Sequence, residues 1–133
     1  MATPQDMAAA FALRYDVFVV GQDVPAELER DDMDAVSDHA VALVDGTVVG
    51  TGRLLPDGTI GRMAVADSAR GRGIGAAVLQ QLEQCARERE LAAVELHAQV
   101  HATGFYAKAG YQPVGEVYLE AGIEHRSMRK LLA

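Results

Sequence analysis

The stretch Arg70-Gly71-Arg72-Gly73-Ile74-Gly75 decides how this sequence is interpreted. It lies between a strand-like segment, residues 59–66, and a helix-like segment, residues 76–90. Glycine lets the backbone approach a ligand closely, and the free N–H groups in the first turn of a helix, at the positive end of its dipole, favour a phosphate. Three glycines at alternate positions with two arginines are more than an ordinary turn needs. The stretch therefore predicts a loop that binds pyrophosphate.

Two nucleotide-binding patterns share features with this loop. A Walker P-loop ends in Gly-Lys-Ser/Thr, whereas Gly75 is followed by two alanines, so that pattern is excluded. The dinucleotide pattern Gly-x-Gly-x-x-Gly/Ala fits Gly71, Gly73 and Ala76. Glu95 then stands where a ribose ligand is expected. Its place in the chain fits poorly, because a Rossmann domain has this turn after its first strand and several strand-like segments precede it here.

Composition limits the classes of protein and partner. With 133 residues, half of them apolar, the chain is long enough for one domain with a hydrophobic core and too short for two ordinary ones. A net charge of −7 argues against nucleic acid or an anionic membrane as the main partner, since both reward clustered Lys and Arg. The single cysteine excludes an internal disulfide, and no signal peptide or membrane-spanning apolar run is recognisable. We therefore expect a cytoplasmic protein.

Periodicity and turn signals predict an alternation of helices and strands. Asp45-Gly46 and Pro56-Asp57-Gly58 are turn signals between strand-like runs, and they indicate an antiparallel meander of three strands. Gly21 and Gly110 stop helices. The expected elements are a helix at 8–20, strands at 39–44, 47–55 and 59–66, a helix at 76–90, a strand at 93–99, a short helix at 101–109, and strands at 112–118 and 124–131.

Two blocks, in this order, resemble the Gcn5-related N-acetyltransferase (GNAT) superfamily. The acyl-CoA signature of that superfamily, Gln/Arg-x-x-Gly-x-Gly/Ala, is met by Arg70, Gly73 and Gly75. Residues 99–111 resemble its segment Asn-x-x-Ala-x-x-x-Tyr-x-Lys-x-Gly-Phe, with Gln in place of the Asn and Tyr in place of the final Phe. The likeness extends over nearly the whole chain.

Other segments, among them residues 61–65 and 122–125, resemble the YjcF/ElaA-type branch of the superfamily. That branch usually has Glu-Gln where this chain has Gly21-Gln22, so any role of that glutamate is absent or moved. The strand that usually precedes the first helix is nearly missing, since only residues 1–6 could supply it. We also consider a homodimer in which a second subunit completes this edge.

The resemblance implies an α+β GNAT fold over residues 1–133, with a mixed, mostly antiparallel central sheet flanked by helices and a splayed strand pair that forms the acyl-CoA cleft. It also implies acetyl-CoA as co-substrate. Its pyrophosphate is expected on the loop backbone, its phosphate charge beside the two loop arginines, and its pantetheine arm along a strand and near an amide side chain. One arginine could instead simply pair with a surface carboxylate. The cofactor-binding residues so implied are Met63, Ala64, Val65, Arg70, Gly71, Arg72, Gly73, Ile74, Gly75, Gln99 and Phe105.

Tyr106 is the expected general acid, because family members commonly place a tyrosine hydroxyl at this position near the CoA sulfur. A phenol is protonated at neutral pH and can give its proton to a departing thiolate. The alternative is a tyrosine that only packs. The general base stays open between four histidines and the acidic segment, residues 27–34. His125, beside Glu124 on a strand expected to border the acceptor cleft, is favoured, and His39 comes next, ahead of His97 and His101.

The function so implied is transfer of an acetyl group from acetyl-CoA to a small-molecule or peptide amine, by direct attack in a ternary complex. A non-catalytic acyl-CoA binding module is the alternative, and a nicotinamide-dinucleotide protein is a third. Residues 27–34 predict a solvated surface or an acidic rim that attracts a cationic amine. Cys85 lies on the apolar face of a helix, which predicts a buried core residue and no nucleophile. No cluster has metal-ligand spacing, so no metal is expected.

Overall fold

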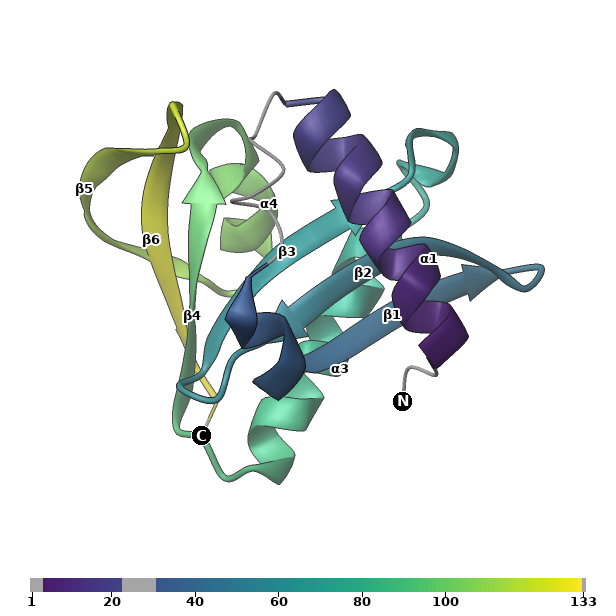
Figure 1. Cartoon of the computed structure of the whole chain (residues 1–133). Coiled ribbons are helices and arrows are strands. Elements are labelled where there is room, and N and C mark those ends of the chain that lie inside the picture. Colours follow the sequence, from purple (N-terminus) through teal and green to yellow (C-terminus); the bar gives the residue numbers. More distant parts are fainter. Residues whose placement is uncertain (1–3, 23–30, 133) are drawn as a thin grey trace.

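The structure is a computed structural model that describes residues 4–22 and 31–132. Its centre is a six-stranded sheet in the order β1-β2-β3-β4-β6-β5 (Figure 1). All neighbouring strands are antiparallel except β3 and β4, which are parallel. The mixed α+β fold predicted from the sequence is therefore confirmed. The strands are β1 (Asp38–Val44), β2 (Thr47–Leu54), β3 (Thr59–Val65), β4 (Ala93–Gln99), β5 (Gln112–Glu120) and β6 (Ile123–Leu131).

Helices lie on both faces of the sheet. The helix α1 crosses β1–β3 on one face, and α3 lies against the other (Figure 1). Among the described helices, none is long and apolar enough to cross a membrane. The helical elements are α1 (Pro4–Arg14), the π-helix η1 (Tyr15–Val20), the 3-10 turns η2 (Asp32–Val36), η3 (Asp67–Ala69) and η4 (Val100–Ala102), and the α-helices α3 (Ile74–Glu88) and α4 (Thr103–Lys108).

The first helix corrects the sequence prediction at its start. It begins at Pro4 and not at residue 8, in keeping with the tolerance of a helix's first turn for proline. Residues 4–6 are therefore helical and supply no first strand, while residues 1–3 lie outside the described part. After Arg14 the helix widens into η1, which closes with Gly21 N–H donating to the Asp16 carbonyl at 3.0 Å. A Cβ at Gly21 would lie 2.7 Å from the Val17 oxygen, so this closure requires glycine.

The core lies between α3 and the sheet. Val78, Leu79 and Leu82 of α3 are each at most 3% exposed, and they belong to one cluster with Ile60 and Leu96 of the central strands. Burial of such side chains contributes about 1.5–3 kcal/mol each. The helix is thus fixed on the strands that precede and follow it, which sets the position of the loop at its amino end.

A second contact ties α3 to the last strand. The Glu83 carboxylate on α3 is only 3% exposed and accepts hydrogen bonds from Tyr111 Oη at 2.7 Å and Lys130 Nζ at 3.0 Å. A buried charge is tolerated only with such partners. Cys85, predicted as a buried core residue, is partly buried beside the core, and burial raises the pKa of its thiol.

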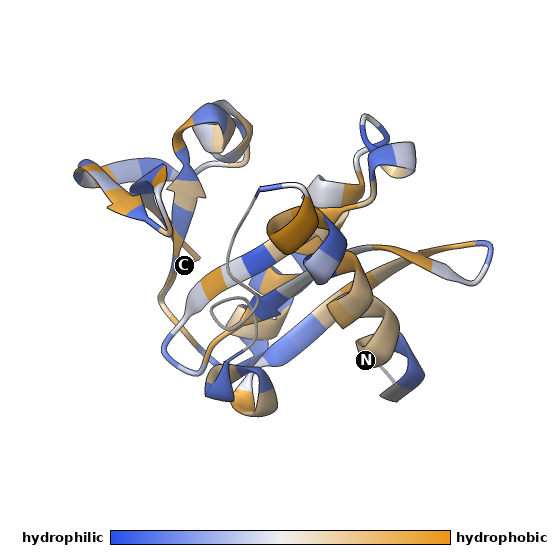
Figure 2. Cartoon of the chain, turned by 45° about the horizontal axis from the view of Figure 1, so that its top comes forward, coloured by the Kyte–Doolittle hydropathy of each residue, from blue (hydrophilic) through white to orange (hydrophobic). Residues whose placement is uncertain are grey.

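The parallel strands part soon after they meet. β3 and β4 pair only at Thr59 with Glu95 and at Ile60 with Leu96. Beyond these pairs β3 has a bulge, in which Gly52 of β2 stands opposite both Arg62 and Met63. Figures 1 and 2 show the two halves of the sheet diverging, with β1–β3 on one side and β4–β6 on the other. The splayed strand pair expected from the sequence is present.

Candidate active site

The loop before α3 has the geometry of an anion site. Gly73 is the amino-terminal cap of α3 with φ 76°, and no side chain caps the helix. The first backbone N–H groups of α3, from Ile74 onward, therefore lack acceptors within the helix. Gly71 also has a positive φ, 80°. The two left-handed glycines turn an exposed loop so that free donors and the positive end of a 15-residue helix meet at one place.

The two loop arginines differ in this structure. Arg70 Nη1 lies 2.6 Å from Asp67 Oδ1, and Arg70 Nε donates to the Val65 carbonyl at 3.3 Å. Both members of that ion pair are more than half exposed, so its contribution to stability is about 1 kcal/mol or less. Arg72 is exposed at the tip of the loop. Pairing of one arginine with a surface carboxylate, the alternative expected from the sequence, thus holds for Arg70.

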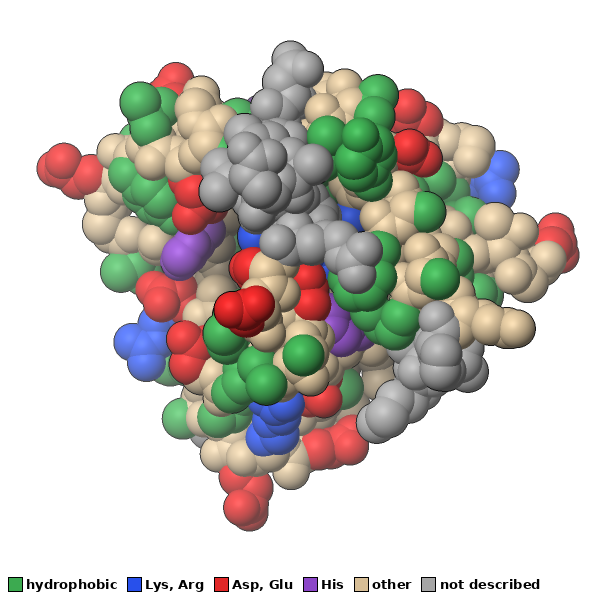
Figure 3. Space-filling model, viewed as in Figure 1, with side chains coloured by type: hydrophobic (Ala, Val, Ile, Leu, Met, Phe, Trp, Pro, Cys, Tyr) green, Lys and Arg blue, Asp and Glu red, His purple; other side chains and the backbone are tan. Residues whose placement is uncertain are grey.

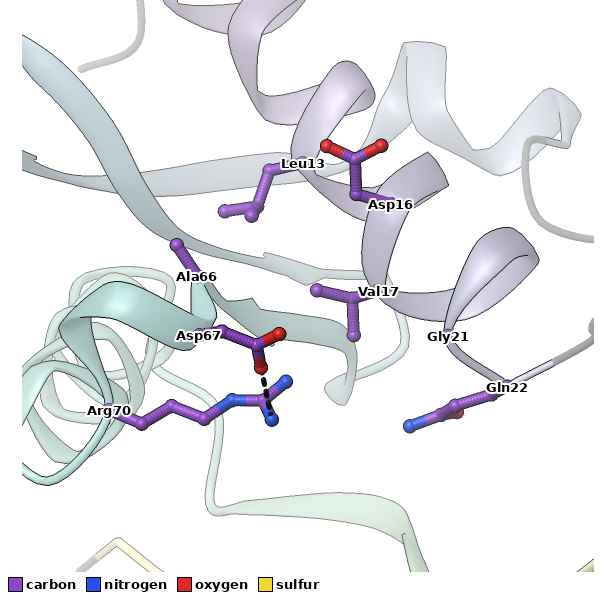
Figure 4. Close-up of a pocket in the computed structure, with 8 residues that line it drawn as sticks. All are labelled: Leu13, Asp16, Val17, Gly21, Gln22, Ala66, Asp67 and Arg70. Atoms are coloured by element: carbon purple, nitrogen blue, oxygen red, sulfur yellow. Dashed lines mark ion pairs between the residues drawn. The ribbon is translucent and has the colours of Figure 1, made fainter.

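A pocket of about 380 Å³ opens beside the loop, between η1 and the end of β3. In Figure 4 the side chains of Arg70 and Gln22 extend toward one another from opposite sides of it. Its wall combines apolar and charged groups, which suits a ligand with both kinds of surface. The lining residues are Leu13, Asp16, Val17, Gly21, Gln22, Ala66, Asp67 and Arg70.

The part of β3 beyond the last β4 pair offers a strand edge to the opening. Ala64 and Val65 pair with β2 through Thr51 and Gly50, so their other edge faces the space that β4 leaves. Met63 is the second residue of the bulge, and the first, Arg62, has φ 51°. A bulge of this kind redirects the following residues. The predicted pantetheine-binding strand, residues 63–65, therefore borders the splayed opening.

Tyr106 on α4 reaches this opening from the side of α3. Its hydroxyl donates to Met63 Sδ at 3.9 Å, and burial raises its pKa to about 12. The neighbouring Phe105 ring meets it edge-on at 5.0 Å. Phe105 Cζ also lies 3.4 Å from the place of a Cβ on Gly75. The structure thus brings Tyr106, Phe105, Met63 and the glycine loop together, and Tyr106 keeps its proton at neutral pH.

Gln99 at the end of β4 is engaged by two other side chains. Its Nε2 donates to Gln22 Oε1 at 2.7 Å, and its Oε1 accepts from His101 Nε2 at 2.6 Å. Gln22 follows η1, so this contact joins the end of the first helix to the far strand of the opening. A ligand that binds the Gln99 amide must replace these hydrogen bonds.

His125 belongs to a cluster that the sequence did not predict. Its Nδ1 donates to the Ile123 carbonyl at 2.7 Å, and its Nε2 lies 3.7 Å from Glu120 Oε2. His97 Nδ1 lies 3.6 Å from Glu120 Oε1. The Tyr118 ring stacks on His125 at 6.0 Å and meets His97 edge-on at 6.0 Å. In the described ranges no group of three His, Cys, Asp or Glu is placed to hold a metal ion.

The other histidines have structural contacts. His39 Nε2 lies 2.8 Å from the Asp34 carbonyl and its ring meets Phe11 edge-on, which places it under α1 and away from the opening. His101 donates a hydrogen bond to the Gln99 side chain. Of the four histidines weighed from the sequence, His97 and His125 are the two that the structure brings together with a carboxylate.

The acidic segment is not simply a solvated surface. Arg14, 1% exposed, donates to Asp34 at 2.8 Å, and Arg53, 5% exposed, donates to Asp31 at 2.7 Å and to Asp34 at 3.0 Å. Burial alone would raise the pKa of Asp34, but the hydrogen bonds from the two arginines outweigh it and lower this pKa to about 2. These two carboxylates are neutralised by arginines and do not serve as an acidic rim. Glu27 and Glu29 lie outside the described residues.

Comparison with known proteins decides the family. Residues 5–132 match the sequence model of the acetyltransferase (GNAT) domain. The chain is a GNAT-family N-acetyltransferase. The resemblance stated from the Arg70 and Tyr106 blocks is thereby confirmed.

Several relatives of this GNAT acetyltransferase cover nearly all of it. The uncharacterized N-acetyltransferase YjcF of Bacillus subtilis is 37% identical over 130 residues, which are 95% of this chain and 93% of YjcF. The protein ElaA of Escherichia coli is 33% identical over 92% of this chain and 85% of its own length. The crystal structure of an acyl-CoA N-acyltransferase from Pseudomonas aeruginosa superposes with a TM-score of 0.84 at 37% identity, covering 96% of this chain and 91% of that one. The YjcF/ElaA-like branch is thus also confirmed.

Proposed function

We propose that this GNAT acetyltransferase moves an acetyl group from acetyl-CoA to a primary amine by direct attack in a ternary complex. The observation that carries the proposal is the splayed opening between β3 and β4, with the glycine loop at the amino end of α3 near one end and a partly buried, protonated Tyr106 on its wall. Family membership supports the reaction class. The loop would bind the phosphate groups at one end of acetyl-CoA, and the tyrosine would donate a proton or a hydrogen bond to the sulfur at the other end.

The donor would be held by backbone and by few side chains. The loop Arg70–Gly75 would take the pyrophosphate on its N–H groups, with Arg72 free to approach phosphate oxygens. The free edge of residues 63–65 would pair with the amides of pantetheine, and Phe105 would pack against the arm beside Gly75. Gln99 would exchange its contacts with Gln22 and His101 for a pantetheine amide.

The acceptor ammonium loses two protons in all, and the sulfur gains one. The acceptor ammonium would give a proton to His125 Nε2, which is the ring nitrogen left over once Nδ1 donates to the Ile123 carbonyl. The amine nitrogen then forms a bond to the thioester carbonyl carbon, and the C–S bond breaks. The sulfur takes a proton from Tyr106, or leaves as a thiolate that accepts a hydrogen bond from Tyr106, and the second proton of the acceptor nitrogen passes to the tyrosinate or to solvent. A backbone N–H of β3 at residues 63–65 would polarise the carbonyl oxygen.

Direct transfer is favoured over an acyl-enzyme. Cys85, the single cysteine of the sequence, lies partly buried on α3 against the core, and burial raises the pKa of its thiol. A thiol with a raised pKa is a poor nucleophile at neutral pH because the thiolate is the reactive form. Cys85 is therefore not expected to carry the acetyl group.

A non-catalytic acyl-CoA binding module remains the second candidate. Two observations favour it: Gly21 stands where the branch has glutamate, and the Gln99 amide is engaged within the protein. Such a module would bind CoA and be stabilised by it without turnover.

The deciding experiment measures release of free CoA thiol from acetyl-CoA over a panel of primary amines, antibiotics and peptides. Amine-dependent release supports the enzyme. Binding of CoA by calorimetry, with no release for any amine, would favour the binding module. Thermal shift with CoA and with NAD in parallel separates both from a nicotinamide-dinucleotide protein, which NAD alone would stabilise.

A further inference from the structure

We propose that Glu120 on β5 is the anionic contact for the acceptor, which is therefore a cationic amine without a carboxylate beside its nitrogen. This inference rests on the proposed acetyl transfer and adds to it the substrate class and the place of the acceptor. It is carried by the geometry of Glu120, His97, His125 and Tyr118 on one face of β4–β6.

Strand alternation places these side chains on one face. Val94, Leu96 and Ala98 of β4 are buried in the core under α3, so the residues between them point to the opposite face. His97 is one of these, and Gln99 is another. His125 pairs with Gln99, and antiparallel partners project on the same side.

The β5 residues follow from the same rule. Tyr118 pairs with His125, and Glu120 lies two residues further along β5, on the same side. Between the pairs Val114–Ser127 and Tyr118–His125 the register of β5 and β6 shifts, with Gly115 at φ 78°. This bulge sets which β5 side chains face the histidines.

Side chains of this face reach solvent. Among the described helices, α1 packs on β1–β3, and in Figure 1 none crosses the same side of β4–β6. Figure 3 shows acidic side chains gathered beside a histidine on that part of the surface. The Glu120 side chain is 50% exposed and that of His97 is 42% exposed. Both can therefore be reached from solvent.

The Glu120 carboxylate keeps hydrogen-bonding capacity for a ligand. Its oxygens lie 3.6 Å from His97 and 3.7 Å from His125, which are ion-pair distances and too long for hydrogen bonds. Among the described residues no group donates a hydrogen bond to Glu120. A carboxylate accepts about four hydrogen bonds. An ammonium group, which donates three, is a matching partner for this carboxylate.

Three other charged or titratable groups lie on this face. Glu95 lies on β4 beside His97 and pairs in register with Arg129 of β6. Burial raises the pKa of the Tyr118 hydroxyl, which lies close to Ser127, Glu120 and Glu95 and has no hydrogen bond of ordinary geometry in the described chain. Tyr118 thus stays neutral at pH 7. A carboxylate next to the acceptor nitrogen would be repelled by Glu120.

The position suits attack on the thioester. His97 is the first β4 residue beyond the last pair with β3, where the strands begin to part. Tyr106 reaches Met63 from the side of α3, whereas this cluster lies on the other side of the sheet. An amine held by Glu120 would enter the opening from the face opposite Tyr106, so nucleophile and proton donor would flank the thioester. The ammonium proton passes to His125 Nε2, as in the proposed reaction.

The test compares Glu120→Gln with Glu124→Gln, using 1,4-diaminobutane and acetyl-CoA. Glu124 is exposed on β6, and since it is the neighbour of His125 it projects from the opposite face. We expect Glu120→Gln to raise KM for the diamine about tenfold, as for loss of a charged hydrogen bond. KM for acetyl-CoA should stay unchanged, and Glu124→Gln should behave as the wild type. Equal KM values for the diamine in the two variants would overturn the assignment.

Two further arms separate this inference from the proposed function. If no amine releases CoA, the proposed acetyl transfer fails, and calorimetric binding of the diamine to the CoA-bound protein still tests Glu120. Weaker binding in Glu120→Gln alone supports the acceptor site, whereas no diamine binding and no diamine turnover by the wild type overturns it.

If Glu120→Gln melts at a lower temperature than the wild type, Glu120→Asp is used instead. This variant keeps the charge, so it should retain a salt-sensitive KM for the diamine, and a salt-insensitive KM would count against the proposal.

Discussion

Replacing Tyr106 by Phe removes one oxygen from the wall of the splayed opening and little else. In the described chain the hydroxyl donates to Met63 Sδ at 3.9 Å, a weak acceptor. The ring keeps its edge-on contacts with Phe105 at 5.0 Å and with Tyr111 at 6.0 Å. The free energy of unfolding should therefore change by about 1 kcal/mol or less, and any loss of activity would be chemical.

The size of that loss follows from two pKa values. Burial raises the pKa of Tyr106 to about 12, whereas a thiol has a pKa of about 8.5. Full transfer of the phenol proton to the thiolate is thus unfavourable by about 5 kcal/mol. Tyr106 would then act mainly through a hydrogen bond to the sulfur as charge develops. General acids contribute about 10²–10⁴ in rate, and we expect the low end, about 10²-fold in kcat.

The assay is amine-dependent CoA release at saturating acetyl-CoA, with calorimetric Kd for CoA measured beside it. Tyr15→Phe, at a tyrosine that is 50% exposed on η1, is the matched control and should retain wild-type kcat. Because Tyr106 keeps its proton up to pH about 12, it should cause no fall in the wild-type rate as pH rises from about 8 to 10. A wild-type kcat in Tyr106→Phe would refute the assignment, and an equal loss of CoA affinity would make Tyr106 a binding residue only.

Gly73→Ala should weaken CoA binding and lower the melting temperature, because an L-residue at φ 76° costs about 1–2 kcal/mol. The control variant Gly46→Ala, at φ 79° in the distant β1–β2 turn, should lower the melting temperature by a similar amount but leave the Kd for CoA unchanged. Asp34→Asn should cost about 3 kcal/mol in urea unfolding because it leaves buried Arg14 without its carboxylate, whereas Asp32→Asn, at an exposed site, should cost about 0.5 kcal/mol or less. In acid, the stabilisation from Asp34 should be complete above its ordinary pKa of 3.8 and be lost as the pH falls through about 2, since its folded pKa is lowered; the Asp34→Asn variant should lack this part of the acid transition.

Elements with strong local signals could be predicted from the sequence. Asp45-Gly46 fixed the β1–β2 hairpin, and strand β4 has the predicted bounds, Ala93–Gln99. The turned conformation of the glycine loop could also be predicted, because Gly71 and Gly73 adopt the positive φ that glycine permits. The expected start of the first helix at residue 8 was wrong because Gln5, Asp6 and Met7 continue the helix back to Pro4, which the first turn tolerates.

Features that depend on register or on distant partners could not be predicted. Arg14 and Asp34 are 20 residues apart and meet only because α1 lies across the sheet above η2. Glu120 and Tyr118 show a simple alternation in the sequence, but the β5 bulge before Tyr118 decides that they face His125. With that register known, the sequence would have predicted His97, His125 and Glu120 as one candidate group for the acceptor, in place of His125 alone.

Acetyl transfer is tested most directly by measuring CoA thiol and N-acetylated amine in the same reaction, with acetyl-CoA and the best acceptor from the amine panel. The protein should form equal amounts of both products, and only when acetyl-CoA and amine are present together. Binding of CoA without either product, or thiol release without an acetylated amine, would contradict acetyl transfer.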